Sequence, residues 1–226
     1  MKNDEPQKRG MSRRNFLLLS SGAVGASLLG FDRATTALGQ PGTEFSESSC
    51  RKDGKMNRKI LVAYASRCGS TGGVAEAVGQ ILCTAETAVD VRLIKNVKDL
   101  APYQAVIVGS AIRMGKWLPE AAEFVKKHQE TLVRLPTAYF MVCMIIQEDT
   151  APKRTEALAY LDPVRKETPG IQPAGIGIFP GAVDYSKLSF LFKTVLKAKG
   201  TPEGDFRNWP AVKAWAAGLR PALLDA

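Results

Sequence analysis

The sequence is poor in the side chains that most often carry enzyme chemistry. His128 is its only histidine, so a histidine-built zinc site, or a nucleophile activated by histidine, would have to use that one residue. The four cysteines, Cys50, Cys68, Cys83 and Cys143, show no C-x-x-C spacing, so neither a zinc knuckle nor a thioredoxin-type dithiol is indicated. We therefore expect no metal centre, and we expect any chemistry to be carried by a bound cofactor.

Basic residues outnumber acidic residues. The 226 residues include 31 Lys and Arg against 22 Asp and Glu, which gives a formal net charge of +9. This balance favours anionic partners such as phosphates, carboxylates or lipid head groups. No aromatic-basic RNA signature or recognition-helix pattern accompanies the charge, so we expect no nucleic-acid partner. With 45% hydrophobic and 23% charged residues, the chain reads as globular, with one core of ordinary size.

The N-terminal residues 1–39 have the pattern of an export signal. Arg13 and Arg14 precede an uncharged, moderately apolar run over residues 15–31. Paired arginines followed by Phe-Leu resemble a twin-arginine signal, so we expect export to the periplasm or to the outer face of the cytoplasmic membrane. Two alternatives remain. The run could be an uncleaved membrane anchor, since its length is near the minimum for a transmembrane helix, or it could be a buried core helix with a basic start.

Small residues at Ala37 and Gly39 offer cleavage positions after either one. Residues 40–57 are polar and lack periodicity, so they are expected to form a flexible linker. The folded domain is then expected to cover residues 58–226.

This domain alternates strand patterns with helix patterns. Short apolar runs predict five strands, at residues 59–64, 88–94, 105–109, 137–146 and 176–179. Amphipathic patterns predict helices at residues 74–82, 118–127 and 152–164, and a last one from Asn208 to Leu219. Such alternation implies right-handed crossovers and a parallel sheet with helices on both faces. The sequence therefore predicts a doubly wound α/β fold.

The first strand-to-helix loop, residues 65–73, is rich in hydroxyl residues and glycine. Backbone N–H groups exposed there, with the positive end of the following helix, make an anion pocket suited to a terminal phosphate. The loop matches neither G-x-x-x-x-G-K-[ST] nor G-x-G-x-x-G, so a nucleoside triphosphate or a dinucleotide is not expected. A loop that offers neutral hydrogen-bond donors and no lysine suits the phosphate of a mononucleotide flavin. The alternative is a plain Ser/Gly turn.

Residues 64–71, with Ala75 four positions on, resemble the flavodoxin phosphate signature. Four further segments resemble the menaquinone-dependent protoporphyrinogen dehydrogenase family: 108–116, 123–128, 180–185 and 205–209. The likeness covers about residues 58–220. It implies a flavodoxin-like sheet of order 2-1-3-4-5 with an insertion before the last helix. It also implies an FMN at the carboxyl ends of the strands, at the switch point between the first and third strands.

The resemblance also carries the site over by position. The residues expected to contact FMN are Ser66, Arg67, Cys68, Gly69, Ser70 and Thr71 at the phosphate, Ser110, Ala111, Ile112, Arg113, Met114, Gly115 and Trp117 on one side of the isoalloxazine, and Cys143 and Met144 on the other. Trp117 either stacks on the ring or packs in the core. Arg113 and Lys116 either meet substrate carboxylates or are solvated loop charges. Cys68 is expected to be a small filler rather than a nucleophile.

The insertion at residues 187–199 combines an apolar stripe with lysines. Leu188, Leu191, Phe192, Val195 and Leu196 recur at helical spacing, and Lys187, Lys193, Lys197 and Lys199 lie among or beside them. A basic amphipathic helix of this kind either contacts an anionic membrane or an acidic partner, or packs its stripe on the domain. If it touches lipid, it brings the flavin toward a quinone pool.

Taken with the resemblance, these features imply an FMN-dependent oxidoreductase similar to quinone-linked protoporphyrinogen dehydrogenases. It would pass reducing equivalents from an organic substrate, a porphyrinogen in that family, to a quinone or a redox protein. One alternative is a non-catalytic electron carrier, which the basic charge weakly opposes because carrier flavodoxins are typically acidic. The other is a flavin-free binding module on the same scaffold.

Overall fold

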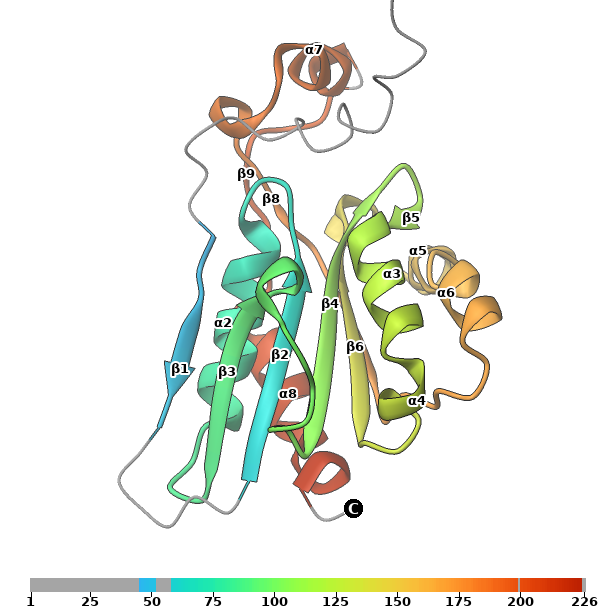
Figure 1. The fold of residues 1–226 in the computed structure, drawn as a ribbon. Helices are drawn as coiled ribbons and strands as arrows, with labels where there is room; N and C mark the ends of the chain where they lie inside the picture. Colours follow the sequence, from blue (N-terminus) through green and yellow to red (C-terminus); the bar gives the residue numbers. More distant parts are fainter. Residues whose placement is uncertain (1–44, 52–57, 199, 225–226) are drawn as a thin grey trace, which may run out of the picture. The chain divides into compact units, whose positions relative to one another are not determined.

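A parallel sheet forms the centre of the molecule. The computed structural model describes residues 45–51, 58–198 and 200–224, so the predicted signal segment and its cleavage positions lie outside the described residues. The strands are β1 (Ser48–Cys50), β2 (Arg58–Ala65), β3 (Thr87–Leu93), β4 (Ala105–Arg113), β5 (Lys116–Trp117), β6 (Thr137–Val142) and β7 (Ile176–Phe179), with a separate pair β8 (Ala182–Val183) and β9 (Gly204–Asp205). The main sheet runs β1-β3-β2-β4-β6-β7 (Figure 1). Its five parallel strands confirm the predicted order 2-1-3-4-5.

Helices cover both faces of this sheet (Figure 1). One face carries α2 (Ser70–Leu82) and α8 (Trp209–Leu224), and the other carries α3 (Pro119–Lys127), α4 (Gln129–Leu132), α5 (Ala151–Ala159) and α6 (Asp162–Glu167). Alternate residues of β2 face the two layers: Ile60 and Val62 pack with α2, whereas Leu61 and Ala63 pack with α3. Burial on both faces explains why the strands are continuous apolar runs.

Two predicted boundaries are wrong. The helix expected at 152–164 is two helices, because Pro163 has no backbone N–H to continue the ladder, and the chain turns after Ala159. The strand expected at 137–146 ends at Val142, where the chain enters the 3₁₀ turn η2 (Met144–Gln147).

The expected loop over residues 110–117 is largely a β-hairpin. Strand β4 continues past Gly109 to Arg113, and β5 pairs back with it, Arg113 opposite Lys116. The turn uses Met114 at φ 51° and Gly115 at φ 70°. Two successive left-handed residues are what a tight two-residue hairpin turn requires.

The predicted linker 40–57 is wrong over its described part. Residues 45–51, called the strap below, include β1, which pairs antiparallel with β3 at the edge of the sheet. A disulfide joins Cys50 to Cys83, the residue that ends α2. The strap is therefore attached to the domain by backbone pairing and by a covalent bond.

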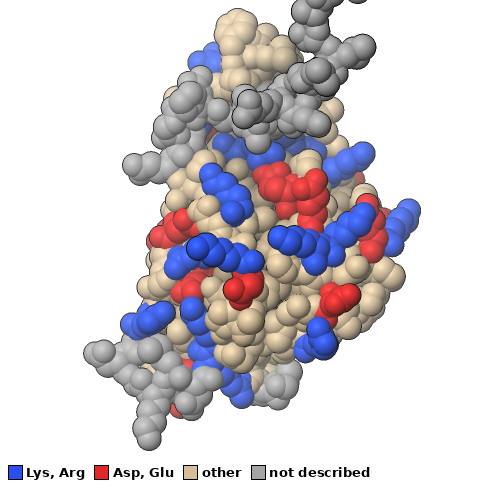
Figure 2. Space-filling model, in the orientation of Figure 1, with Lys and Arg blue, Asp and Glu red and all other residues tan. Residues whose placement is uncertain are grey.

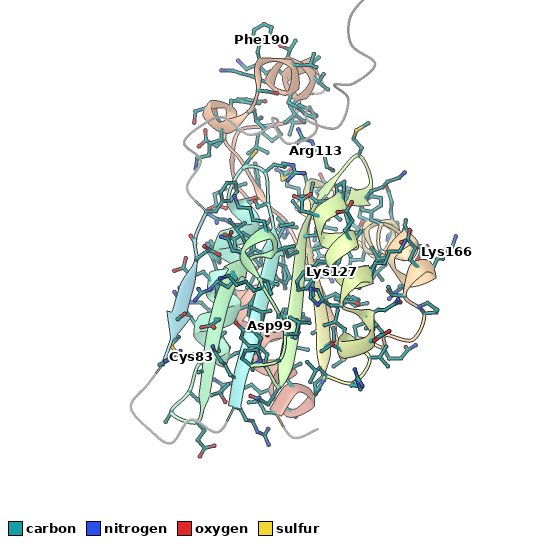
Figure 3. The ribbon with its side chains drawn as sticks, in the orientation of Figure 1. Cys83, Asp99, Arg113, Lys127, Lys166 and Phe190 are labelled. Atoms are coloured by element: carbon teal, nitrogen blue, oxygen red, sulfur yellow. A yellow bond between two sulfur atoms is a disulfide. The ribbon has the colours of Figure 1, made fainter. Side chains whose placement is uncertain are left out.

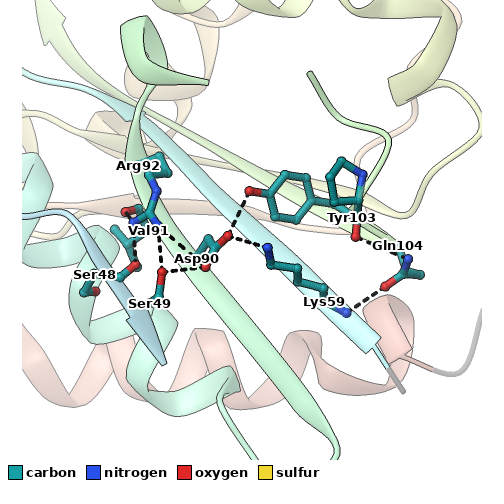
Figure 4. A network of polar contacts seen from close by, with 9 residues as sticks. Ser48, Ser49, Lys59, Asp90, Val91, Arg92, Tyr103 and Gln104 are labelled. Atoms are coloured by element: carbon teal, nitrogen blue, oxygen red, sulfur yellow. Dashed lines mark hydrogen bonds and ion pairs between the residues drawn. The ribbon is translucent and has the colours of Figure 1, made fainter. Parts of the chain in front are cut away.

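A buried carboxylate, Asp90, fixes the strap to the neighbouring strands (Figure 4). Ser49 Oγ donates to its Oδ1 at 2.7 Å, and Lys59 Nζ lies 2.8 Å from its Oδ2. Tyr103 OH donates to Oδ2 at 3.0 Å. Burial alone would raise the pKa of Asp90, but hydrogen bonds from Lys59, Ser49 and Tyr103 outweigh it and hold that pKa below its ordinary value.

The insertion before the last helix folds as a helix, α7 (Phe190–Ala198), preceded by the short 3₁₀ turn η3 (Tyr185–Lys187). The pair β8–β9 forms its stem (Figure 1). Within the described ranges, none of the helices is both long and apolar enough to cross a bilayer.

Candidate functional site

A cleft of about 580 Å³ opens at the carboxyl ends of β2, β4 and β6. Segments far apart in the sequence form its walls: the loop after β2, the β4–β5 hairpin, η2, the β8 stem and α7. Parallel strands place all of their following loops at one edge, which is why these segments meet. Most of the predicted contact residues line it, namely Ser66, Arg67, Cys68, Ser70, Ala111, Ile112, Arg113, Met114, Gly115, Cys143 and Met144.

The loop after β2 closes on itself immediately before the N-terminus of α2. Gly69, at φ 88°, precedes α2, and its carbonyl oxygen accepts from the N–H groups of Gly72 and Gly73. The Gly69 N–H donates to Ser66 Oγ at 3.0 Å, which closes the loop on itself. The N–H groups of Ser70 and Thr71 precede those of the two glycines in α2 and have no intrahelical acceptor, so they are the ones that an anion would meet.

Thr71 supplies the most telling detail of this loop. It directly follows Ser70, which lines the cleft, and it is fully buried. Its Oγ1 has no hydrogen-bond partner within the part of the chain that is described. A buried hydroxyl without a partner costs free energy, so Thr71 is a candidate to bond a ligand held beside Ser70.

Arg67 is engaged elsewhere. Its guanidinium binds the Glu120 carboxylate of α3 through two contacts, one of them Nη2 to Oε2 at 2.9 Å. This bidentate pair joins the loop to the opposite helical layer. The expectation that Arg67 holds a phosphate is therefore not supported by its geometry.

Several other predicted residues lie outside the cleft. Ser110 is buried, and its Oγ accepts from Leu118 N–H at 3.0 Å, which anchors the hairpin. Trp117 is buried against Tyr139, with ring centroids 5.4 Å apart in an edge arrangement. Pairing of β5 with β4 turns this indole into the core, so Trp117 packs rather than stacks on a ligand. Lys116 is exposed and does not line the cleft, and neither do Gly69 and Thr71.

Cysteine thiols in the cleft are poorly suited to nucleophilic chemistry. Burial raises the pKa of Cys68, whose Sγ lies 3.6 Å from the Lys187 carbonyl oxygen. Burial also raises the pKa of Cys143 to about 11. Both thiols stay protonated at neutral pH, as a filler role for Cys68 requires. His128 packs on Phe124, away from the cleft.

Helix α7 borders the cleft, so its apolar stripe faces the domain, which is the second of the two alternatives that the sequence left open. Its stripe of Leu191, Phe192, Val195 and Leu196, with Leu188 before it, lines the cavity. Figure 3 places Arg113 between α7 and the ends of the strands, and Phe190 on the far side of that helix. Phe190 is 85% exposed. On the face seen in Figure 2, the surface over α7 is largely uncharged.

The fold and the cleft agree with the comparison against known families. A model of the flavodoxin domain matches residues 61–205, and the chain belongs to this family. Among individual proteins, protoporphyrinogen IX dehydrogenase [quinone] of Leishmania major is 26% identical over 176 residues, covering 70% of this chain and 73% of that one. The Escherichia coli (strain K12) protein of the same name is 26% identical over 166 residues, covering 70% and 88%.

Solved structures with a similar fold are flavodoxins and flavoproteins. A flavodoxin from the domain Archaea has a TM-score of 0.43 at 19% identity, over 73% of this chain and 98% of that one. A flavoprotein from Lactobacillus acidophilus NCFM, solved in complex with FMN, has a TM-score of 0.40 at 12% identity, over 54% and 93%. Together with the family match, the relatives support a flavin-binding redox function.

Proposed function

We propose that this chain is an FMN-dependent oxidoreductase that passes reducing equivalents from an organic substrate to a quinone or a redox protein. The observation that carries the proposal is the loop after β2, where the N-terminus of α2 borders an apolar cleft through Ser70, and where the buried hydroxyl of the next residue, Thr71, has no partner among the described residues. A terminal phosphate would meet the polar end, and a flat ring system would meet the apolar walls.

The described residues fit FMN. Backbone N–H groups of the first turn of α2, with the hydroxyls of Ser70 and Thr71, would hold the phosphate. Residues 111–115 and the pair Cys143 and Met144 would flank the isoalloxazine. Bound FMN would supply reversible transfer of one or two electrons. The apolar stripe of α7 would keep water from the ring, and the hairpin backbone would hold the ring in place.

The substrates follow from the relatives and from the cleft. The two relatives are named as quinone-linked protoporphyrinogen IX dehydrogenases, and a porphyrinogen and a quinone both have large ring systems. The cleft wall is mostly apolar, and the stripe of α7 extends it above the strand ends. We therefore propose a porphyrinogen as the electron donor and a quinone as the acceptor. The fold alone would equally serve an electron carrier, and turnover distinguishes the two.

Export through a twin-arginine route belongs to the same proposal. What supports it, besides Arg13 and Arg14, is the Cys50–Cys83 disulfide, since such bonds persist in oxidising compartments and are rare in the cytosol. The destination would be the periplasm or the outer face of the cytoplasmic membrane. Peripheral contact with that membrane would come from the exposed Phe190 and the lysines of 187–199.

The test uses the full chain reconstituted with FMN. Mass spectrometry of the released cofactor should identify FMN, and porphyrin should form anaerobically only when protein, porphyrinogen and a menaquinone analogue are all present. Release of FAD, or no flavin after reconstitution, contradicts the cofactor. A flavoprotein that exchanges electrons with a reductase but never oxidises a porphyrinogen is the electron carrier instead.

A further inference from the structure

Arg113 is a cation of the cleft wall that lacks an acidic partner. Among the described residues, Arg67 also lines the cleft but is paired with Glu120. Lys187 nearby is paired with Asp184 at 3.5 Å. No carboxylate pairs with Arg113 in the described part of the chain, although it is only partly exposed and burial lowers its pKa. A half-buried charge in this position is more stable when an anion joins it.

The aromatic ring of Phe192 holds this guanidinium in a defined orientation. Arg113 Cζ lies 3.6 Å from the centre of the Phe192 ring on α7. A guanidinium carbon this close lies over the face of the ring, where the ring attracts the cation. The N–H donors lie in the plane of the guanidinium, so stacking leaves them able to make the two parallel bonds that a carboxylate accepts.

The cleft wall beside Arg113 is mostly apolar, although Arg67 and Asp184, each paired with another side chain, also line the cleft. Leu191, Val195 and Leu196 extend the wall along α7, and Ile112 and Met114 flank Arg113 on the hairpin. A ligand that satisfies the whole wall combines an anionic group with a large apolar body. A neutral quinone satisfies only the apolar part.

We propose that Arg113, which lies over the Phe192 ring, binds a carboxylate of the electron donor. The charge of Arg113 then favours the anionic electron donor over the neutral quinone. This rests on the proposed function, because it assigns a substrate contact in the same cleft. The FMN phosphate is the other anion that the guanidinium could meet, since Arg113 and the loop residue Cys68 are close enough to influence each other's ionisation. The experiment separates the two anions.

The binding arm compares two porphyrins on the oxidised, FMN-loaded protein. Protoporphyrin IX carries two carboxylates and its dimethyl ester carries none, and fluorescence reports the Kd of each in the same detergent. Wild type should bind the diacid about tenfold or more tightly than the diester, because one charge-assisted contact is worth that much. Arg113→Met should remove this preference, and Arg113→Lys should retain only part of it. Phe192→Leu should weaken it.

Lys197→Met is the matched control. Lys197 also lies against an aromatic ring, with Nζ 5.2 Å from the centre of Tyr185, but it does not line the cleft. Its removal takes away one positive charge on α7 and should leave the diacid preference unchanged. The FMN Kd of Arg113→Met should rise only by the few-fold expected for the loss of one side chain beside the ring, since the α2 N-terminus is proposed to hold the phosphate.

Three outcomes would overturn the proposal. The first is a diacid preference that survives in Arg113→Met. The second is a large rise in the FMN Kd of that variant with the preference intact, which would make Arg113 a phosphate ligand. The third is a wild type that binds neither porphyrin, or binds both equally. The binding arm needs no turnover, so a protein that selects the diacid but fails to oxidise a porphyrinogen would contradict the proposed function alone.

Discussion

The disulfide between Cys50 and Cys83 joins the strap at the sheet edge to the residue that ends α2. The other end of α2 is where we propose that the FMN phosphate binds. Reduction therefore releases the strap from the same helix that is expected to hold the cofactor. The disulfide spans 33 positions of sequence, and a loop of that length stabilises a domain by about 3–4 kcal/mol.

We expect Cys50→Ser with Cys83→Ser to lower the free energy of unfolding by about that amount in urea titrations. A reducing agent should shift the wild-type midpoint toward that of the double variant and leave the double variant unchanged. Cys68→Ser is the control, and it should keep the wild-type response to the reductant. A wild-type midpoint that ignores reduction would mean that the strap contributes nothing to stability.

Asp90 should make stability fall in acid. Its folded pKa is lowered, so its contribution is complete above the ordinary carboxyl pKa of about 4 and is lost as pH falls through the folded value. Asp90→Asn should reduce stability at pH 7 by about 1–3 kcal/mol and flatten the acid limb of the profile. Asp149→Asn, which removes an exposed partner of Arg154, should change neither.

Thr71 allows FMN binding to be separated from folding. Thr71→Val removes a buried hydroxyl that has no partner among the described residues, so the cofactor-free domain should be as stable as wild type or more so. FMN binding should weaken by about 1–3 kcal/mol, roughly 5- to 150-fold in Kd, if the hydroxyl bonds the phosphate. Fluorescence titration with FMN measures this. Unchanged affinity removes Thr71 from the site.

Export should depend on Arg13 and Arg14. The FMN that we propose would be bound without a covalent bond and loaded in the cytoplasm, so a route that carries folded proteins would suit the loaded domain. Replacement of both residues by Lys should leave a folded, yellow protein in the cytoplasm. Cell fractionation with flavin fluorescence follows the outcome. Normal export of the double variant would argue for an ordinary secretory route.

Phe190 should mediate any contact with a membrane, because it points away from the cleft (Figure 3) and is exposed. Phe190→Ser should weaken binding to anionic liposomes at low salt by about tenfold or more, the range for losing one buried aromatic side chain. Each nearby lysine adds about 1 kcal/mol, and salt should weaken that part. The control is Val133→Ser, an exposed apolar residue of the α4 region. Absence of liposome binding by wild type would contradict membrane contact.

The parallel core could be predicted because each of its strands is buried on both faces, which produces apolar runs such as residues 105–109. Strand β1 could not be predicted from the sequence. Ser48, Ser49 and Cys50 have no apolar alternation, and the strand depends on Asp90 and Cys83, which lie far away in the sequence.

The location of the site could be predicted for a topological reason, since loops after parallel strands share one edge. The roles of single residues could not be predicted from the sequence. Arg67 is paired with Glu120, 53 positions away, and no local pattern indicates that partner. Trp117 turns into the core because of the hairpin register, and the direction in which the α7 stripe faces depends on its stem.

The stem itself has a consequence for the evolution and engineering of this protein. Ala182 pairs with Asp205 and Val183 with Gly204, and Phe206 N–H donates to the Gly181 carbonyl oxygen at 3.0 Å. The two ends of residues 184–203 therefore meet at the spacing of neighbouring strands, about 5 Å. A short turn could close the same gap without moving the parallel sheet. Another segment could therefore be grafted onto the stem, and it would give the cleft a different wall while the parallel sheet stays in place.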